Sequence, residues 1–383
     1  MITILAKPSI IRDLPLLKET SKYFLNTDLS SVLIICVQHL YSTTYNMFFE
    51  LFGKGLNPKN LFVAGKCYST DPVVYQQLRK DGVSVSPTSR SFNSHDEYDI
   101  KFDRNLEQFL ETVLAKANIK SFKKIIILDD GGHLITCANK KLPKTLDIIG
   151  IEQTSAGYNR LCKNPPFFPV INTARSWVKM KYESPIIINL ALKKLEQKIA
   201  HLTPHPKKIL LMGYGTLGKC IHLFLKGKYD LSYYDANPEN SMIQPQKLKK
   251  ELCKFDLIIG ASGETSISRD LIHFLKKPVV LASVSSSDRE LDAVFLRKQL
   301  KSTGNCHLDL NINGITLLNC GFPINFDSDY SKIDTDDFQL TRSLIFGAVC
   351  QAVNTNANNS AFIDLDPEFQ LFLESQLTDK THD

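Results

Sequence analysis

A glycine-rich turn in the second half of the sequence has residue types suited to binding phosphates. The apolar run KKILLM (207–212) leads directly into GYGTLG (213–218), and the residues that follow have helical spacing. Gly213 permits a tight turn, Gly215 lets phosphates approach the backbone, and Gly218 lets the helix pack closely on the strand. Helix-terminal amides and the helix dipole both favour an anion at this point. The pattern predicts a dinucleotide-binding loop.

An acid farther along the chain indicates which dinucleotide this loop would bind. Thr216 and Leu217 open the predicted helix beside the phosphates, and the next strand-like run, LSYYD, ends in Asp235. An acid ~20 residues past the glycines binds a ribose diol and repels a 2′-phosphate, which favours NAD over NADP. The loop also resembles the phosphate loop GxxxxGK[ST], but Cys220 replaces its magnesium-binding hydroxyl. We therefore expect NAD as cofactor and no metal ion.

Polar side chains follow apolar runs at three places in the first half of the chain. These are Asp129-Asp130-Gly131-Gly132, EQTS at 152–155 and NTARSWVKMK at 172–181. The carboxyl ends of parallel strands meet at one edge of a sheet, where ligands bind. Acids and lysines at such an edge can transfer protons. The three segments together predict a catalytic site.

The elements that must position these residues form two alternating series. Between residues 31 and 128, strand-like runs such as VLIICV and KKIIILDD alternate with helical stretches, and a second alternation begins at 207. Residues 185–200 have helical spacing and end before the breaker-rich HLTPHP at 201–206. This rhythm predicts an α/β fold of two Rossmann-like, doubly wound domains with a cleft between them.

The domain boundaries follow from these elements. We expect a substrate domain of residues 1–183 and 338–365, an NAD-binding domain of residues 190–330, and a short C-terminal tail at 366–383. The domains should close over the cleft, hinged near Ser184 and Asp327, because a reactive intermediate has to be protected from water.

Composition excludes several classes of protein. With 43% hydrophobic and 22% charged residues the chain is typical of a globular protein, and it has no apolar run long enough to span a membrane. Nine cysteines without a CxxC pair, and no secretory signal, favour a cytoplasmic location. A scattered charge of +6 does not favour nucleic-acid binding. The expected partner is a small-molecule substrate, and a homo-oligomer is compatible with the sequence.

Four segments, taken in chain order, resemble the S-adenosylhomocysteine hydrolase (adenosylhomocysteinase) family. They are LDDGGHL, GIEQTSAGYNRL, PVINTARSWVKMKYES and GYGTLGK, where the family has DDGG, EETTTG, PAIN with two downstream lysines, and GYGxVGKG. CVQHLYSTTY with His39, GASGE at 260–264 and GFPIN at 321–325 extend the similarity over nearly the whole chain. The chain looks like a divergent member of that family.

The resemblance implies a reaction and a set of roles. The family uses NAD to oxidise a ribose 3′-hydroxyl, which permits reversible hydrolysis of S-adenosylhomocysteine, a step of one-carbon metabolism. By resemblance, Lys179 helps to remove the hydroxyl proton, and Asp130 with His39 shuttles protons at the sugar. Glu183 would belong to the same catalytic group, and Gln153 and Ser184 would bind substrate. The positions implied for the cofactor, besides the glycine loop and Asp235, are Thr154, Ser155, Ser262, Gly263 and Asn325.

Several departures from the family pattern fall at the substrate site. Gln153 replaces a sugar-binding glutamate, and Glu183-Ser184 replaces an Asp-Asn pair. Tyr41 and Thr43 replace the threonine and glutamate that read adenine. A site that loses its hydrogen-bonding groups rejects the old ligand, so these changes predict an altered substrate.

Alternatives therefore stay open. The chain could be a catalytically impaired homologue that binds NAD or a nucleoside and regulates a partner, or an NAD-dependent dehydrogenase of a different small substrate. The residues also have structural interpretations, with Asp130 capping a turn, His39 packed in the core and Lys179 on the surface. The three positions falling in family order beside the glycine loop favour a functional site.

Overall fold

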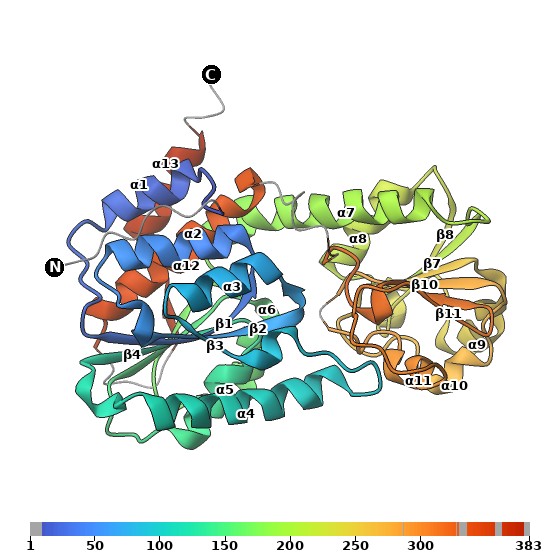
Figure 1. Ribbon diagram of the computed structural model, residues 1–383. Helices are drawn as coiled ribbons and strands as arrows, with labels where there is room; N and C mark the ends of the chain where they lie inside the picture. The colour runs from blue at the N-terminus through green and yellow to red at the C-terminus, as the bar shows by residue number, and fades with distance from the viewer. Residues whose placement is uncertain (1–9, 286, 327, 329–334, 357–361, 379–383) are drawn as a thin grey trace. The chain divides into compact units, whose positions relative to one another are not determined.

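The computed structural model describes residues 10–378 except 286, 327, 329–334 and 357–361. The chain divides into two compact units (Figure 1). Unit 1 consists of Met1–Arg90, Asp103–Pro185 and Asp329–Asp383, and unit 2 of Ser91–Phe102 and Ile186–Ser328. The expected hinge residue Ser184 lies next to the boundary after Pro185, whereas Asp327 lies outside the described residues.

Unit 1 is built on a fully parallel, 7-stranded sheet in the order β13-β6-β5-β4-β1-β2-β3. The central strands are rich in isoleucine, valine and leucine and are buried along nearly their whole length, as expected when helices cover both faces of a sheet. The strands are β1 Val32–Leu40, β2 Leu61–Thr70, β3 Ser84–Val85, β4 Lys124–Asp129, β5 Ile148–Glu152, β6 Val170–Asn172 and β13 Phe362–Asp364.

Helices lie on both faces of this sheet. In Figure 1, α2 and α12 lie on one face with α1 and α13 beside them, and α4 and α5 lie on the other. The first group shares one hydrophobic core with the strands, including Phe48, Phe346 and Phe369. The helices are α1 Pro15–Tyr23, α2 Ser42–Gly53, α3 Pro72–Lys80, α4 Tyr98–Lys116, α5 His133–Lys141, α6 Ser155–Lys163, α12 Thr335–Asn354 and α13 Pro367–Thr378.

The C-terminal part of unit 1 differs from the expected short tail. Residues 367–378 form helix α13, which buries Phe369 and Leu373 completely. Gly347 of α12 lies so close to Phe369 that an added Cβ would meet its ring at 2.1 Å. The cause is the apolar spacing in PEFQLFLESQL, which gives the segment a face that packs in the core.

Unit 2 contains a 6-stranded sheet in the order β11-β12-β10-β9-β7-β8, parallel except for the β11–β12 pair. Its strands are β7 Lys208–Met212, β8 Asp230–Tyr234, β9 Leu257–Gly260, β10 Val279–Ser283, β11 Leu310–Ile312 and β12 Ile315–Leu317. Its helices are α7 Ser184–Ala200, α8 Thr216–Leu225, α9 Leu248–Glu251, α10 Arg269–Ile272 and α11 Ala293–Arg297. Because β8 and β9 lie on opposite sides of β7, the strand order reverses at β7, where doubly wound sheets bind their ligands. The expected α/β fold with two Rossmann-like sheets is confirmed.

Residues 91–102, which we expected in the first domain, belong to unit 2 because a buried arginine holds them there. Arg297 is fully buried and donates from Nε to the carbonyl oxygen of Ser94 at 2.7 Å. Its Nη1 donates to the carbonyl oxygen of Cys320 at 2.6 Å, and its Nη2 to Asp288 at 2.5 Å. The segment is thus joined to the core of unit 2 by hydrogen bonds.

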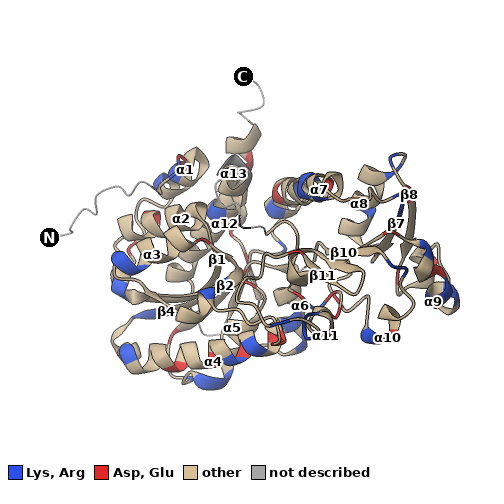
Figure 2. Cartoon of the chain, turned by 45° about the vertical axis from the view of Figure 1, so that its right-hand side comes forward, with Lys and Arg blue, Asp and Glu red and all other residues tan. Residues whose placement is uncertain are grey.

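Charges of both signs are mixed on the surface helices. In Figure 2, basic and acidic segments share α4 and α9. In the part of the chain that the structure describes, we find no helix whose length and apolar character would suit a membrane span.

Candidate active site

A buried polar cluster occupies the carboxyl edge of the unit 1 sheet. His39 lies near the end of β1, Lys66 within β2, Asp130 directly after β4 and Gln153 directly after β5. These strands are neighbours and parallel, so their carboxyl ends converge. Lys66, Asp130 and Gln153 are each less than 9% exposed. Burial of this many hydrogen-bonding groups is costly unless they are paired, and here they are paired with one another.

Asp130 is at the centre of the cluster. Its Oδ1 accepts from Lys66 Nζ at 2.5 Å, and its Oδ2 accepts from Gln153 Nε2 at 2.5 Å. The Nε2 atom of His39 lies 3.4 Å from the same Oδ2. Burial alone would raise the pKa of Asp130, but Lys66, His39 and the two hydrogen bonds outweigh it and hold the pKa well below its usual range. Asp130 is therefore a carboxylate at neutral pH.

His39 is held in its neutral form. Its Nδ1 lies 2.5 Å from Ser69 Oγ. Burial lowers the pKa of His39 to about 3, and the attraction of Asp130 only partly opposes this. Burial also acts to lower the pKa of Lys66, but Asp130 more than reverses it and raises that pKa above its usual range. The cluster thus combines a cation, an anion and a neutral imidazole.

A local irregularity between β1 and β2 brings these groups together. Gln38 pairs with Gly65, yet Leu40 pairs with Thr70, so residues 66–69 form a bulge opposite His39. Lys66 and Ser69 lie in this bulge, one beside Asp130 and the other beside the imidazole. Bulges of this kind re-aim side chains next to active sites.

The double glycine after β4 shapes the loop that carries Asp130. Gly131 and Gly132 have φ angles of 117° and 72°, which side chains rarely tolerate. Behind the loop, Asp129 and Glu152 are in register on β4 and β5. Burial raises the pKa of Glu152 well above its usual value, and the charge of Asp129 adds to this effect. Glu152 Oε1 accepts from the amides of Gly131 and Thr154 at 3.2 and 2.7 Å, so these acids support the loop.

Two residues expected to bind the cofactor lie at the start of α6. The Thr154 hydroxyl accepts from the Gly157 amide at 3.0 Å and donates to Glu152 at 2.7 Å. Thr154 therefore caps the helix, a role that accounts for its side chain without a cofactor. Ser155 is the first helical residue and is exposed.

Lys179 and Glu183 form a second pair close to the cluster. A π-helical turn, Lys179–Glu183, runs into α7 and sets the lysine Nζ 2.6 Å from Glu183 Oε2. Thr341 of α12 donates to Glu183 Oε1 at 2.9 Å. The Ser184 hydroxyl donates a long, weak hydrogen bond of 3.4 Å to the carbonyl oxygen of Lys179. Lys181, two residues from Lys179, is instead exposed and paired with Glu374.

Arg342 of α12 extends the cluster between these two groups. Its Nη1 lies 3.4 Å from Gln38 Oε1 and its Nε lies 3.3 Å from Thr43 Oγ1. Gln38 in turn donates to Gln153 Oε1 at 3.0 Å. The oxygen and the nitrogen of the Gln153 amide thus both form hydrogen bonds within the protein. Burial lowers the pKa of Arg342 to about 10, opposed by the charges of Glu183 and Asp130.

The structure brings His39, Asp130 and Gln153 together, and it adds two residues that the sequence analysis missed. Lys66 follows the apolar run LFVAG, so the strand-end reasoning that selected Asp130 could have selected it as well. Arg342 interrupts the apolar helical run LTRSLIFGAVCQAV, and a charge on the buried face of a helix is a signal of its own.

The glycine loop of unit 2 has the geometry that its sequence predicts. Gly213 has a φ of 102°, and a Cβ there would lie 2.6 Å from the amide nitrogen of Ser262. A Cβ on Gly218 would lie 2.1 Å from the carbonyl oxygen of Gly213, whereas one on Gly215 would meet no atom within 4 Å. Close packing thus requires glycine at 213 and 218, whereas Gly215 faces open space. Thr216 and Leu217 begin α8, as expected.

Asp235 lies at the carboxyl end of β8 and contacts this loop. Its Oδ2 accepts from the amide of Tyr214 at 2.6 Å, and its Oδ1 accepts from the amide of Asn237 at 2.9 Å. Each oxygen retains capacity for another donor. The carboxylate is thus fixed beside the loop, at the strand end where a ribose-binding acid is expected.

A buried acid that the sequence analysis did not select, Glu290, reaches the loop after β9 from the segment that follows β10. Glu290 Oε1 accepts from the Ser262 amide at 3.0 Å and its hydroxyl at 2.7 Å, and Oε2 accepts from the Gly263 amide at 2.9 Å. The donors of Ser262 and Gly263 are therefore engaged within the protein. Asn325 differs, because its buried Oδ1 has no hydrogen-bond partner among the residues that the structure describes.

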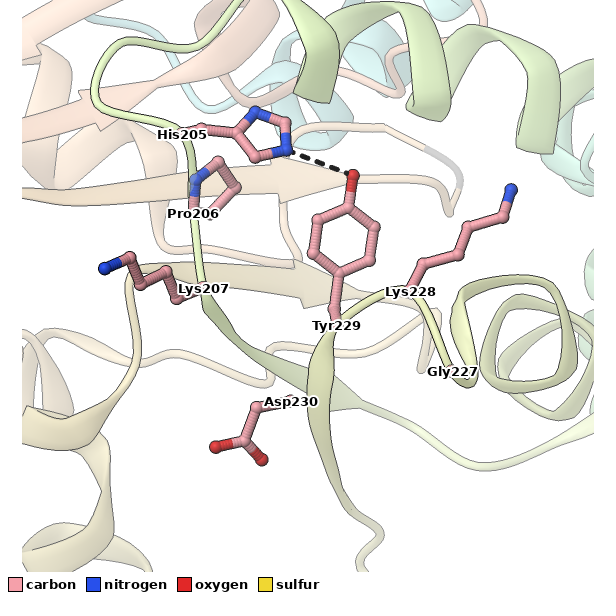
Figure 3. Close-up of a pocket in the computed structure, with 7 residues that line it drawn as sticks. All are labelled: His205, Pro206, Lys207, Gly227, Lys228, Tyr229 and Asp230. Atoms are coloured by element: carbon pink, nitrogen blue, oxygen red, sulfur yellow. Dashed lines mark hydrogen bonds between the residues drawn. The ribbon is translucent and has the colours of Figure 1, made fainter.

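A surface pocket in unit 2 lies at the opposite edge of the sheet. It has a volume of about 410 Å³ and is lined by residues 205–207 and 227–230, which precede or begin β7 and β8. Figure 3 shows Tyr229 directed toward His205, with their side chains 3.4 Å apart. None of the residues that we selected from the sequence lines this pocket.

Comparison with known proteins gives relatives without a stated activity. No family model matches the chain. An uncharacterized protein of Mycobacterium tuberculosis strain CDC 1551 / Oshkosh is 38% identical over 330 residues, which cover 85% of this chain and 65% of that protein. An uncharacterized protein of strain ATCC 25618 / H37Rv matches to the same extent. The chain thus spans about 65% of the length of the relatives that it matches.

Solved structures resemble the chain only distantly. A dipicolinate synthase chain from Bacillus halodurans has 10% sequence identity and a TM-score of 0.38, covering 85% of this chain and 98% of that one. NAD⁺-bound 3-phosphoglycerate dehydrogenase from Entamoeba histolytica has 10% identity and a TM-score of 0.40, covering 87% of this chain and 100% of that one. Likenesses at this level say nothing of the activity of this chain.

Proposed function

We propose that this chain is an NAD-dependent enzyme that oxidises a secondary alcohol of a small molecule, as a divergent relative of adenosylhomocysteinase. The observation that carries the proposal is the pairing of neutral His39 with ionised Asp130 at the carboxyl edge of the unit 1 sheet. A neutral imidazole can accept a proton, and a fixed carboxylate beside it stabilises the imidazolium that results.

The residues of unit 2 fit an NAD cofactor. A Cβ on Gly213 would collide with the backbone of Ser262, so the backbone must follow a tight path, and the space above Gly215 is open. Asp235 lies where a ribose diol could donate hydrogen bonds to its carboxylate. The Oδ1 of Asn325, which no described residue contacts as a donor, could accept from an amide such as that of nicotinamide. These residues would hold the cofactor.

The groups of unit 1 would then handle the protons of the reaction. NAD, when bound, accepts a hydride from the carbon that bears the hydroxyl group. Lys179 would relay the hydroxyl proton, accepting it as its ammonium group passes a proton to Glu183, 2.6 Å away. After oxidation, His39 could accept a proton from the carbon next to the carbonyl group as that group becomes an enolate, with Asp130 stabilising the imidazolium. Lys66 would keep Asp130 ionised throughout.

A second candidate is a dehydrogenase of a different small substrate, and the Gln153 contacts favour it. This amide donates to Asp130 and accepts from Gln38, so it is committed to internal hydrogen bonds. A residue used in this way is poorly placed to bind two sugar hydroxyls. The proposal therefore covers ribosides and other secondary alcohols, with S-adenosylhomocysteine and adenosine as the first compounds to test.

The test is a direct measurement of cofactor reduction. The purified protein would be loaded with NAD, and the absorbance at 340 nm recorded after addition of adenosine, S-adenosylhomocysteine or other secondary alcohols. We expect a rise with one class of compound that is abolished in Lys179→Ala and Asp130→Asn. Lys181→Ala is the matched control, because this neighbouring lysine is exposed and paired with Glu374. Retained NAD without reduction by any compound would refute the catalytic proposal.

A further inference from the structure

Arg342 is a buried cation with an incomplete set of partners. It is 3% exposed, yet its hydrogen bonds are long, 3.3 Å to Thr43 and 3.4 Å to Gln38, and both acceptors are neutral. Its Nη2 donates to no acceptor among the described residues. A guanidinium has five N–H donors, and Nη2 is not among the fully buried side-chain atoms that lack a partner, so its donors remain available. The hydrogen bonds that the protein supplies to Arg342 are therefore incomplete.

Arg297 shows how the same protein satisfies an arginine that has a structural role. Its guanidinium donates to the backbone carbonyl oxygens of Ser94 and Cys320 at 2.7 and 2.6 Å, and it forms an ion pair of 2.5 Å with Asp288. All three nitrogens are used. The two arginines differ in their hydrogen-bond partners and not in their burial, since both side chains are almost fully enclosed.

The two acids whose charges act on Arg342 already have cations of their own. Asp130 is bound by Lys66 at 2.5 Å, and Glu183 is bound by Lys179 at 2.6 Å. Within the described ranges, no carboxylate lies within ion-pairing distance of Arg342. The guanidinium thus has no acid of its own, and burial lowers its pKa although the charges of Glu183 and Asp130 act to raise it.

We propose that Arg342 binds an oxyanion of the substrate, a carboxylate or a phosphate group. The planar fork of a guanidinium matches the oxygens of either group, and such a pair is strong in a desolvated site. Thr43 and Gln38 hold the plane of the side chain from its Nε and Nη1 atoms, which leaves Nη2 to meet the ligand. The inference rests on the proposed function, since it describes the substrate of that same site.

Oxyanion binding can be measured without catalysis. The melting temperature of the full chain would be recorded with sodium malonate or sodium phosphate, each against sodium chloride at equal ionic strength. A bound anion at ~100 times its Kd should raise the Tm by roughly 5–11 °C. A shift with malonate alone identifies a carboxylate, a shift with phosphate alone identifies a phosphate group, and equal shifts with all three salts would refute a specific site.

Variants separate a binding role from a structural one. Arg342→Met should abolish the anion-induced shift without lowering the Tm of the free protein, because it removes an uncompensated buried charge. Arg342→Lys should retain a reduced shift, and Lys181→Ala the whole of it. Arg297→Met should lower the Tm or prevent folding, because that arginine is fully paired. Loss of folded protein in Arg342→Met, or an unchanged shift, would overturn the inference.

The outcome is independent of cofactor reduction. An anion-induced shift that depends on Arg342, without any NADH formation, would reject the proposed oxidation and retain the oxyanion site. NADH formation from an uncharged alcohol at an unchanged rate in Arg342→Met would reject the oxyanion site and retain the proposed oxidation.

Discussion

Removal of Lys66 tests the electrostatics of the candidate site most directly. Lys66→Met keeps most of the side-chain volume but leaves Asp130 buried without its cation. The two side chains are only 11% and 5% exposed, so solvent screens their interaction little. Breaking a buried ion pair costs about 3–5 kcal/mol, and at roughly 2–4 °C per kcal/mol for a unit of this size the Tm should fall by roughly 6–20 °C.

The same substitution should change how stability depends on pH. In the native protein the pKa of Asp130 lies below its unfolded value, so its contribution to stability is present above the unfolded pKa and is lost as pH falls through the folded pKa. Without Lys66 the folded pKa of Asp130 rises, since burial is no longer offset by that cation. The Tm difference between Lys66→Met and the native protein should therefore shrink as the pH is lowered toward 4.

Calorimetry of a double-mutant cycle supplies the assay. Lys66→Met, Asp130→Asn and the double variant should show a coupling of at least about 2 kcal/mol, because each single change leaves one buried charge unpaired. Lys18→Met is the control, since its pair with Asp13 is exposed and should contribute less than about 1 kcal/mol. Additive effects, or a loss in Lys66→Met no larger than in Lys18→Met, would refute the interpretation of the cluster as an ion-paired site.

Three further predictions follow from the geometry. Gly215→Ala should fold normally, because a Cβ there meets no protein atom, but it should retain less NAD, because the Cβ would occupy the space left for the cofactor. Gly218→Ala should also lower the Tm, because its Cβ would lie 2.1 Å from a carbonyl oxygen. Equal melting temperatures of the two variants would contradict this. With a pKa of about 3, His39 should show no imidazole titration by NMR between pH 5 and 8, and its contribution to stability should be complete above pH ~6.5 and decline as pH falls from there toward 3. Gly347→Ala should destabilise unit 1 by forcing α12 from Phe369, as measured by urea unfolding, and an unchanged midpoint would show that the helices can adjust.

The sequence was sufficient to predict the two sheets and some of the residues in each candidate site. His39 and Asp130 follow neighbouring apolar runs, and parallel strands bring such residues together without any knowledge of the loops. The glycine loop and Asp235 were predictable for the same reason. What could not be predicted is the bulge at residues 66–69, because the apolar pattern of β2 does not record where its pairing with β1 shifts.

Residues from distant parts of the chain were also beyond the sequence pattern. Arg342 is 212 residues from Asp130 by their numbers, and only the packing of α12 on the sheet brings it to the cluster. Glu290 follows a polar stretch, SVSSSDR, that has no periodicity from which its burial could be inferred. Periodicity identifies which face of an element is buried, but it does not identify which elements meet.

The contacts of Gln153 and Arg342 bear on how far the substrate differs from that of the enzymes the sequence resembles. A glutamine in place of a glutamate removes one negative charge, and its amide is then consumed by Asp130 and Gln38. In the same network Arg342 is buried and forms no ion pair with the described residues, although the charges of Glu183 and Asp130 act on it. Both features make the site more positive than one that binds neutral sugar hydroxyls, while the His39–Asp130 pair is kept. If the proposed site transfers protons, its arginine is suited to an alcohol that carries its own negative charge, and the proposal is then a changed substrate and not a lost activity.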